Sequence, residues 1–514
     1  CGGSDEVLPP RADAGGPPRA DAGRSETDAG DDGLPRSEPA ACRFAIPPAL
    51  GLTEGDDYAC GDLAVRENRG AGTGVIRVHY LRVFGAAAGR AAIYLDGGPG
   101  GSGDSILAWL AYVPGLLDGL RAQGDFLVLA QRGTRYALPA LDCEDLAECV
   151  DGVGAEVDLT AFNTAYNADD VDDLRAALGY EQLDVYGISY GSRLGLEVLR
   201  RHPDRVRSAW LGGLVPAQVD WMAAVPASFT SGLRALDAAC AADAACAEAF
   251  GALEPALAAS LDDLDDEPVA FDYGGMSYEL DGSTWASLLF RALYARSAYA
   301  WLPLAIHDLA ERRTDRVAEL LAALLDRSGG GVSLGLYYAV VCGELFNPPD
   351  PDAPDRANAA VPAAIRSRFE GTWYAFADAC DAWPKHDMAA ALAAPVAFDG
   401  PVLLASGAID PITPPAFGDL AAQTLAGATH VVFAGSGHGA SLQTPCGNDM
   451  LVAFFADPSA PPATDCANSI TIDFVIPGAT ARRAVPRQRI RAELRRAPMP
   501  PQVVDALRRA RRSH

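Results

Sequence analysis

The chain has 514 residues, which is long enough for one large catalytic domain with an insertion or for several ordinary domains. Hydrophobic residues make up 49% and charged residues 21%, as in an ordinary globular protein, but the formal net charge is −27. This acidity argues against a nucleic-acid partner. No apolar run approaches the roughly 18 residues that a bilayer-spanning helix needs.

The chain begins with Cys1 in the sequence CGGSD, and a stretch over residues 6–41 follows that is rich in Pro, Gly, Asp and Ala and repeats PPRADAG. Such a composition cannot bury a core, so we expect residues 1–41 to be a disordered tether. A first Cys ahead of a polar tether resembles the mature N-terminus of a bacterial lipoprotein. The resemblance implies an exported, cell-envelope protein held on a membrane by lipidation of Cys1; the alternative is a chain that starts at a cysteine by chance.

Short apolar segments alternate with helical patterns in the first part of the folded region, residues 42–215. The strand candidates are 75–84, 91–96, 125–130, 183–187 and 208–213. Strands that alternate with helices predict an α/β fold with a mostly parallel sheet and helices on both faces. Ala- and Leu-rich helical segments then fill residues 216–395, which we interpret as an inserted helical cap. Strand candidates return at 400–407 and 429–435, so residues 396–470 should complete the core.

Residues 471–514 form a basic C-terminal extension, because residues 482–514 contain eleven Arg and two acidic residues. We expect a solvated helical end that folds against the acidic body of the protein. Contact with a membrane surface is the alternative.

The eleven cysteines consist of Cys1 and five neighbouring couples, none with the spacing of a zinc finger. In an exported protein the simplest connectivity is sequential, although sequence alone leaves other pairings open. The expected disulfides are Cys42–Cys60, Cys143–Cys149, Cys240–Cys246, Cys342–Cys380 and Cys446–Cys466. No metal or cofactor is expected.

Ser189 lies between Gly187 and Gly191 in the pattern Gly-x-Ser-x-Gly, after a strand candidate and before a helical pattern. This pattern is typical of a nucleophile elbow. A tight turn lifts the serine oxygen clear of the sheet and directs the N-terminus of the next helix at developing negative charge. The pattern alone also fits a glycine-bordered turn with a capping serine.

A serine nucleophile in this topology needs an acid and then a histidine base further along the chain. Asp410 follows the strand candidate 400–407 in GAIDPITPP, and His438 follows the last strand candidate in the glycine-rich AGSGHGASL. None of the other histidines has this context. We therefore expect Ser189, Asp410 and His438 to form a catalytic triad; a turn-capping Asp and a surface-loop His are the alternatives.

Two backbone N–H groups are expected to stabilise the oxyanion. One belongs to Tyr190, the residue after the nucleophile, and the other to Gly98 in the glycine-rich stretch YLDGGPGGSG. A phosphate-binding loop is the alternative for this stretch. It lacks both the Lys-Ser/Thr ending of a P-loop and the Gly-x-Gly-x-x-Gly of a dinucleotide site.

Five segments together carry a resemblance to a known family: DGGPGGSG, QRGTRYALPALDC, GISYGSRLGLEVLRRHPDRV, PVLLASGAIDPITPP and GSGHG. They resemble the α/β-hydrolases of the tripeptidyl and prolyl aminopeptidase group over residues 42–470. The resemblance implies an α/β-hydrolase fold with a helical cap, a Ser-Asp-His triad and a C-terminal segment like that of the tripeptidyl aminopeptidases. It also implies that Glu344, in VVCGELF, holds the amino group of the substrate; a surface helix Glu is the alternative. The chain departs from the family at Ala130, Arg135 and Tyr136, which leaves substrate choice open.

The sequence thus predicts an exported, lipid-anchored serine hydrolase that removes short peptides or single residues from the N-termini of peptide substrates. The main alternative is a carboxylesterase that acts on small or lipid-like esters, because the same triad serves both reactions. A catalytically silent surface-binding module is a third possibility, against which the complete triad argues.

Overall fold

The computed structural model describes residues 33–70, 72, 74–273, 275–325, 332–460, 462–477 and 485–496. The chain divides into two compact units, Cys1–Leu34 and Pro35–His514, and every helix and strand described belongs to the second. Cys1 and residues 2–32 of the predicted tether lie outside the described residues. So do residues 478–484 and 497–514 of the predicted C-terminal extension.

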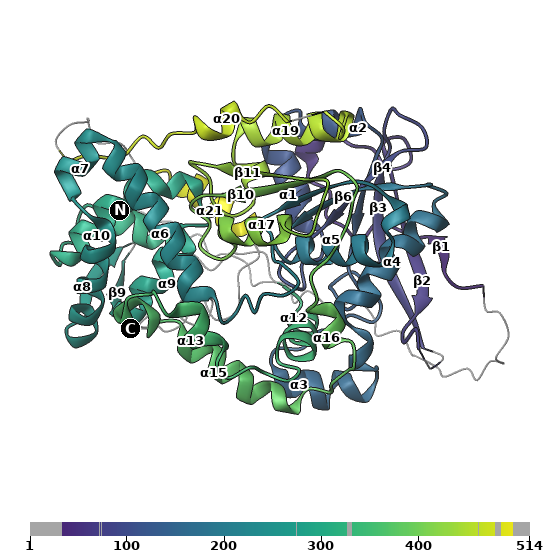
Figure 1. The fold of residues 1–514 in the computed structure, drawn as a ribbon, viewed down its shortest axis with the longest axis horizontal. Coiled ribbons are helices and arrows are strands. Elements are labelled where there is room, and N and C mark those ends of the chain that lie inside the picture. Colours follow the sequence, from purple (N-terminus) through teal and green to yellow (C-terminus); the bar gives the residue numbers. More distant parts are fainter. Residues whose placement is uncertain are drawn as a thin grey trace, which may run out of the picture. The chain divides into compact units, whose positions relative to one another are not determined.

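A nine-stranded sheet in the order β1-β2-β3-β5-β4-β6-β7-β10-β11 forms the centre of this unit (Figure 1). Its six parallel strands are β4 (Ala91–Leu95), β5 (Asp125–Leu129), β6 (Leu183–Ile188), β7 (Val206–Gly212), β10 (Val402–Gly407) and β11 (Ala428–Phe433). Antiparallel pairing at one edge adds β1 (Arg36–Pro39), β2 (Tyr58–Arg66) and β3 (Val75–Val83). The predicted mostly parallel sheet is confirmed.

Helices cover both faces of the sheet. Successive residues of β4 alternate between two apolar clusters, with Ile93 and Leu95 in one and Tyr94 in the other, as the two-residue period of a strand requires. The first cluster includes side chains of α4 (Thr164–Ala177) and α5 (Tyr190–Arg201). The second includes side chains of α1 (Asp104–Tyr112), α2 (Leu116–Arg121) and α19 (Pro445–Ala456).

The strand β1 corrects the predicted boundary of the tether. Residues 36–39 were expected to be disordered, but they pair with β2 from Arg36 opposite Ala64 to Pro39 opposite Gly61. An edge strand is held by its backbone hydrogen bonds on one side and needs no apolar face of its own. Its polar composition therefore did not distinguish it from the tether.

Two groups of helices make up the region predicted as a single cap. The first group surrounds its own apolar cluster and comprises α6 (Val225–Ala242), α7 (Ala244–Phe250), α8 (Leu253–Asp266), α9 (Gly282–Ala292), α10 (Leu302–Ala310) and α11 (Ala318–Leu324). It also contains a hairpin that the sequence did not predict, β8 (Val269–Tyr273) with β9 (Met276–Leu280). The second group shares a cluster with the core and includes α12 (Leu334–Val340), α13 (Ala353–Asn358) and α15 (Glu370–Ala379).

The basic C-terminal extension contains the helix α21 (Arg487–Arg496), as predicted. One face of this helix is not solvated, because Ile490 and Leu494 are fully buried in the cluster of the first cap group. The remaining short helices are α3 (Leu146–Asp151), α14 (Ala363–Arg366), α16 (Ala389–Leu392), α17 (Pro415–Ala422), α18 (Ala440–Gln443) and α20 (Asp465–Asn468).

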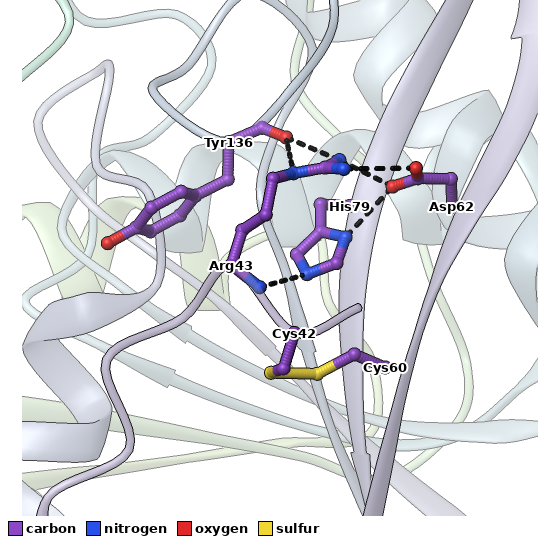
Figure 2. The surroundings of a disulfide bond; sticks show 6 residues. All are labelled: Cys42, Arg43, Cys60, Asp62, His79 and Tyr136. Carbon is purple, nitrogen blue, oxygen red and sulfur yellow. Dashed lines mark hydrogen bonds and ion pairs between the residues drawn. A yellow bond between two sulfur atoms is a disulfide. The ribbon is translucent and has the colours of Figure 1, made fainter. Parts of the chain in front are cut away.

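All five predicted disulfides are present, with the sequential connectivity. Figure 2 shows the first, Cys42–Cys60, beside a buried polar group. Asp62 accepts hydrogen bonds from Arg43 and lies 2.8 Å from Nδ1 of His79. Arg43 also donates to the backbone oxygen of Tyr136. The disulfide attaches the chain before β2 to β2 itself, and Arg43 attaches it to the loop after β5.

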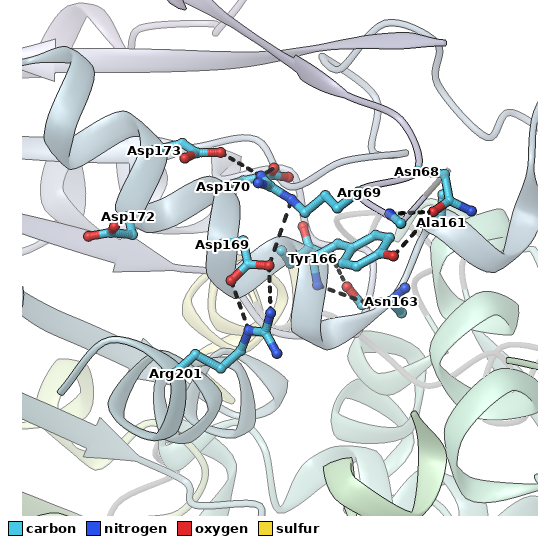
Figure 3. A network of polar contacts seen from close by, with 12 residues as sticks. Asn68, Arg69, Ala161, Asn163, Tyr166, Asp169, Asp170, Asp172, Asp173 and Arg201 are labelled. Carbon is cyan, nitrogen blue, oxygen red and sulfur yellow. Dashed lines mark hydrogen bonds and ion pairs between the residues drawn. The ribbon is translucent and has the colours of Figure 1, made fainter. Parts of the chain in front are cut away.

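A second polar network fixes that loop to α4 through Arg132, and Figure 3 shows the part of it around Arg69, Asp170 and Arg201. Arg132 is fully buried and donates two hydrogen bonds of 2.7 Å to the carboxylate of Asp170. Arg69 pairs with the same carboxylate, and Arg201 pairs with the neighbouring Asp169. A buried carboxylate is stable only when it is paired and hydrogen-bonded, and Asp170 is both. Arg132 belongs to the QRGTR motif, so the network sets the position of that motif beside the sheet.

Candidate active site

Ser189 occupies the sharp turn between β6 and α5, at the carboxyl end of the central strands. Its backbone has φ 60° and ψ −130°, a left-handed conformation that is strained for a residue with a side chain. Glycines are required on both sides of it. A Cβ at Gly191 would lie 1.9 Å from the backbone oxygen of Leu95, and a Cβ at Gly187 would lie 2.3 Å from the backbone oxygen of Gly191. The local geometry is that of a nucleophile elbow.

Asp410 and His438 come together from the loops that follow β10 and β11. Oδ2 of Asp410 lies 2.9 Å from Nδ1 of His438, and both side chains are buried. The other carboxylate oxygen accepts hydrogen bonds from the backbone N–H groups of Ile412 and Thr413, at 3.0 and 2.9 Å. The carboxylate is therefore fixed on its loop and holds one ring nitrogen of His438, which leaves the other nitrogen for the substrate side.

Thr413 is a third contributor to this pair that the sequence analysis missed. Its hydroxyl donates a 2.6 Å hydrogen bond to Oδ2 of Asp410 and lies 3.1 Å from Nδ1 of His438. A signal for this turn was present in the motif. Thr413 follows Asp410 by three residues, and an Asp side chain at the start of such a turn commonly accepts backbone N–H groups of the next residues.

Ser189 and His438 line the same pocket. Its volume is about 30 Å³, and the other lining residues are Tyr94, Asp96, Gly97, Ser105, Trp109, Ile188, Tyr294, Gly439 and Leu442. Most of these walls are aromatic or aliphatic, and Tyr294 comes from the cap. Within the described part of the chain, the Ser189 hydroxyl makes no hydrogen bond to His438. Such contacts commonly tighten only when substrate binds.

The two predicted oxyanion donors belong to the residue after the nucleophile and to the loop after β4. Tyr190 is the first residue of α5, where helix N–H groups lack partners within the helix. Gly98 belongs to the loop after β4 and has φ 117°, a conformation that favours glycine. Gly97 lines the pocket, but its N–H donates a 2.9 Å hydrogen bond to the carboxylate of Asp96. Gly98 therefore remains the predicted donor from this loop.

Asp96 organises the same loop. Its carboxylate accepts hydrogen bonds from the N–H groups of Gly97 and Gly103, at 2.9 and 2.8 Å. It also accepts one from the hydroxyl of Ser105, at 2.6 Å. Burial raises the pKa of Asp96, which these hydrogen bonds partly offset. The loop wraps so closely around the carboxylate that a Cβ at Gly101 would lie 2.6 Å from its carbon. Sequence analysis assigned no role to this residue.

Glu344 is not among the residues that line this pocket, and its predicted role in holding the substrate amine stays a prediction. It belongs to a single π-helical turn, Val341–Leu345, and its side chain has no solvent exposure. One carboxylate oxygen accepts a 2.8 Å hydrogen bond from the N–H of Thr164 at the start of α4, and the other lies 3.7 Å from Nε of Arg193. These partners fix the cap to two core helices, while Oε2 makes no hydrogen bond within the described residues.

Replacement of Glu344 by Gln is expected to destabilise the fold by about 1–3 kcal/mol, because Arg193 loses the charge beside it. It should change kcat/KM by the same factor on free-amine peptides and on nitrophenyl acetate. Urea unfolding and the two assays measure this. Glu319→Gln is the matched control, since Glu319 also lies 3.7 Å from an arginine, Arg487, but is half-exposed. A loss confined to free-amine peptides would support the predicted role of Glu344 in holding the substrate amine.

The three departures from the family pattern take different positions. Ala130 is buried at the end of β5. Tyr136 is buried, and its hydroxyl donates a 3.0 Å hydrogen bond to Asp104 at the start of α1. Arg135 is exposed, and its N–H donates to the hydroxyl of Ser102 in the glycine-rich loop. The guanidinium of Arg135 lies over the ring of Tyr136, 5.4 Å from its centroid.

Known protein families match both parts of the chain that contribute residues to the site. Residues 93–244, which include Gly98 and Ser189, match the family described as alpha/beta hydrolase fold. Residues 366–467, which include Asp410 and His438, match the family described as TAP-like protein. Among solved structures, an α/β-hydrolase from a Medee basin deep-sea metagenome library is 13% identical, with a TM-score of 0.36, over 74% of this chain and 94% of its own.

Two curated proteins are similar in sequence. The chain is 26% identical to the serine protease Hip1 of Mycobacterium tuberculosis. The similar stretch of 459 residues makes up 79% of this chain and 86% of that protein. It is 30% identical over 140 residues to a probable proline iminopeptidase of Streptomyces coelicolor, which covers 26% of this chain and 36% of that protein. The resemblance to α/β-hydrolase peptidases that the motifs predicted is confirmed.

Proposed function

The chain is a serine hydrolase with the α/β-hydrolase fold, and from this premise we propose that it is a peptidase that releases short peptides or single residues from the N-termini of its substrates. The observation that carries the proposal is the convergence of Ser189 and His438 on one pocket, with Asp410 held behind the imidazole. Similarity to a serine protease over most of the chain favours peptides as substrates and argues against a silent binding module.

In the proposed mechanism, the free ring nitrogen of His438 accepts the proton of the Ser189 hydroxyl as the oxygen attacks the scissile carbonyl. Asp410 stabilises the imidazolium that forms and keeps the ring in the required tautomer. The N–H groups of Tyr190 and Gly98 stabilise the tetrahedral oxyanion, aided by the N-terminus of α5. His438 then gives the proton to the leaving amine, and water resolves the acyl-enzyme by the same steps.

A carboxylesterase that acts on small or lipid-like esters is the second candidate. The enclosed position of Glu344 favours it, because an exopeptidase needs a group that holds the cationic amine and the predicted one is not accessible. The apolar walls of the pocket also suit a small acyl group.

Three classes of substrate separate these functions. We expect the protein to cleave aminoacyl or tripeptidyl anilides with a free amine at least tenfold faster, in kcat/KM, than the same compounds with an acetylated amine. A preference of that size corresponds to about 1.4 kcal/mol of recognition of the charged amine. Nitrophenyl esters complete the set. Efficient turnover of esters or acetylated peptides, with little turnover of free-amine peptides, would instead support the esterase or an endopeptidase.

We also propose that the protein is exported and held at the cell envelope by lipid on Cys1. Five disulfides support export, because disulfides persist in oxidising compartments. None of the described helices combines the length and the apolar character that a membrane crossing requires. Mass spectrometry of the N-terminal peptide from the native host tests the proposal, and an unmodified Cys1 thiol there would contradict it.

A further inference from the structure

Gln443, the last residue of α18, binds the loop that carries His438 through both ends of its side-chain amide. Oε1 accepts a 2.9 Å hydrogen bond from the N–H of Gly437, and Nε2 donates a 2.8 Å hydrogen bond to the backbone oxygen of His438. A side-chain amide can accept through its oxygen and donate through its nitrogen at the same time, and Gln443 uses both ends on this loop. The backbone on both sides of the histidine Cα is therefore held by one side chain.

The same amide reaches the cap. Nε2 of Gln443 also donates, at 3.4 Å, to the backbone oxygen of Tyr294, just after α9. The ring of Tyr294 lies 5.0 Å from the ring of His438, centroid to centroid, and both residues line the pocket. Burial raises the pKa of Tyr294 well above its ordinary value, so its hydroxyl stays neutral beside the imidazole.

Close packing leaves this loop little freedom beside the cap. A Cβ at Gly437 would lie 2.0 Å from the hydroxyl of Tyr299 and 2.7 Å from the backbone oxygen of Leu293. The Tyr299 hydroxyl itself donates a 2.7 Å hydrogen bond to that oxygen. The loop must therefore approach the cap backbone at Gly437, and Gln443 joins the two by hydrogen bonds.

The hydrogen bonds from Asp410 and Thr413 to His438 go to the ring, whereas Gln443 binds the backbone from which the ring extends. We propose that Gln443 is a positioning residue that holds the His438 base in its reactive place and couples that place to the cap. The inference rests on the proposed role of His438. A base displaced by about 1 Å can lose about 100-fold in rate, so a backbone tether at this point acts on turnover rather than on substrate affinity.

The test compares two variants with a matched control. Gln443→Met keeps the length of the side chain but removes all three hydrogen bonds. Gln443→Glu can still accept from Gly437, but its carboxylate faces the two carbonyl oxygens. Gln182→Met is the control, because the Gln182 amide also donates to a backbone oxygen, that of Asp204 at 3.1 Å, from an exposed position before β6. Gln182 lies at the opposite end of this strand from Ser189.

We expect both Gln443 variants to lower kcat about 10- to 100-fold on a nitrophenyl ester and on a peptide anilide, with KM within about twofold of wild type. Inactivation by a fluorophosphonate, which needs the base but no amine, should slow by the same factor. The unfolding temperature should stay close to that of Gln182→Met, whose kinetics should match wild type.

Several results would overturn the inference. One is a folded Gln443 variant with kcat within about twofold of wild type, and another is a loss that appears only in KM or equally in Gln182→Met. If one Gln443 variant does not fold, the other decides. Wild-type protein that cleaves neither substrate and does not react with the fluorophosphonate would refute the proposed function, and this inference would fall with it.

Discussion

Replacement of Ser189 by Ala is expected to lower kcat by about 10⁴-fold or more while the fold remains intact. The reason is that the hydroxyl is the only group of the proposed triad that forms a covalent bond to the substrate. Alanine at this turn removes one oxygen and keeps the backbone conformation, so stability should change little. A residual rate from oxyanion stabilisation and binding should remain, as in other serine hydrolases without their nucleophile.

The measurement combines turnover with covalent labelling. Wild-type protein should take up one fluorophosphonate on the peptide that contains Ser189, and Ser189→Ala should take up none. Ser287→Ala is the control, since this serine lies in α9 of the cap, outside the pocket, and donates a 2.9 Å hydrogen bond within its own helix. Turnover by Ser189→Ala within tenfold of wild type would show that another residue is the nucleophile.

Local sequence patterns were sufficient to predict the features that depend on residues close together in the chain. The strand β5 is a short apolar run with a clear end, and Gly187, Ser189 and Gly191 mark a turn whose geometry excludes larger side chains. Asp410 and His438 follow β10 and β11 directly, and the carboxyl ends of parallel strands meet at one edge of the sheet. Their proximity could therefore be predicted from order along the chain.

Features that depend on distant contacts could not be predicted in this way. The pairing of Glu344 with Thr164 and Arg193 joins residues that are 180 and about 150 positions apart, and no local signal reports such a contact. A glutamate in a helical pattern reads as exposed, whereas here it is enclosed. The role of Gln443 has the same origin, because one of its three partners, Tyr294, belongs to the cap.

The division of the cap into two groups could not be predicted for the same reason. Both groups are Ala- and Leu-rich helices, so composition gives no boundary between them. The difference lies in what they cover. Trp285 of the first group is fully buried in that group's own cluster, whereas Tyr337 of the second packs in the cluster of the core. Tyr294 comes from the first group and lines the pocket, so we expect this group to contact the substrate.

Replacement of Asp410 by Asn is expected to lower kcat by about 10⁴-fold with little effect on KM, the size of loss seen when the acid of a serine-protease triad becomes an amide. An asparagine NH₂ can donate to Nδ1 of His438, which would stabilise the tautomer that has its proton on the wrong nitrogen. The backbone N–H groups of Ile412 and Thr413 would favour the amide oxygen on their side, which turns the NH₂ toward the ring.

The loss should therefore arise from the chemical step and not from unfolding. Asp399→Asn is the matched control, because Asp399 is exposed in the loop before β10, on the same segment of chain. Steady-state kinetics on the ester and on the peptide anilide should show equal losses for Asp410→Asn, since both reactions use the same base. If Asp410→Asn retains kcat within about tenfold of wild type, the carboxylate does not orient the base. The hydroxyl of Thr413, 3.1 Å from Nδ1, would then be the group that holds the imidazole.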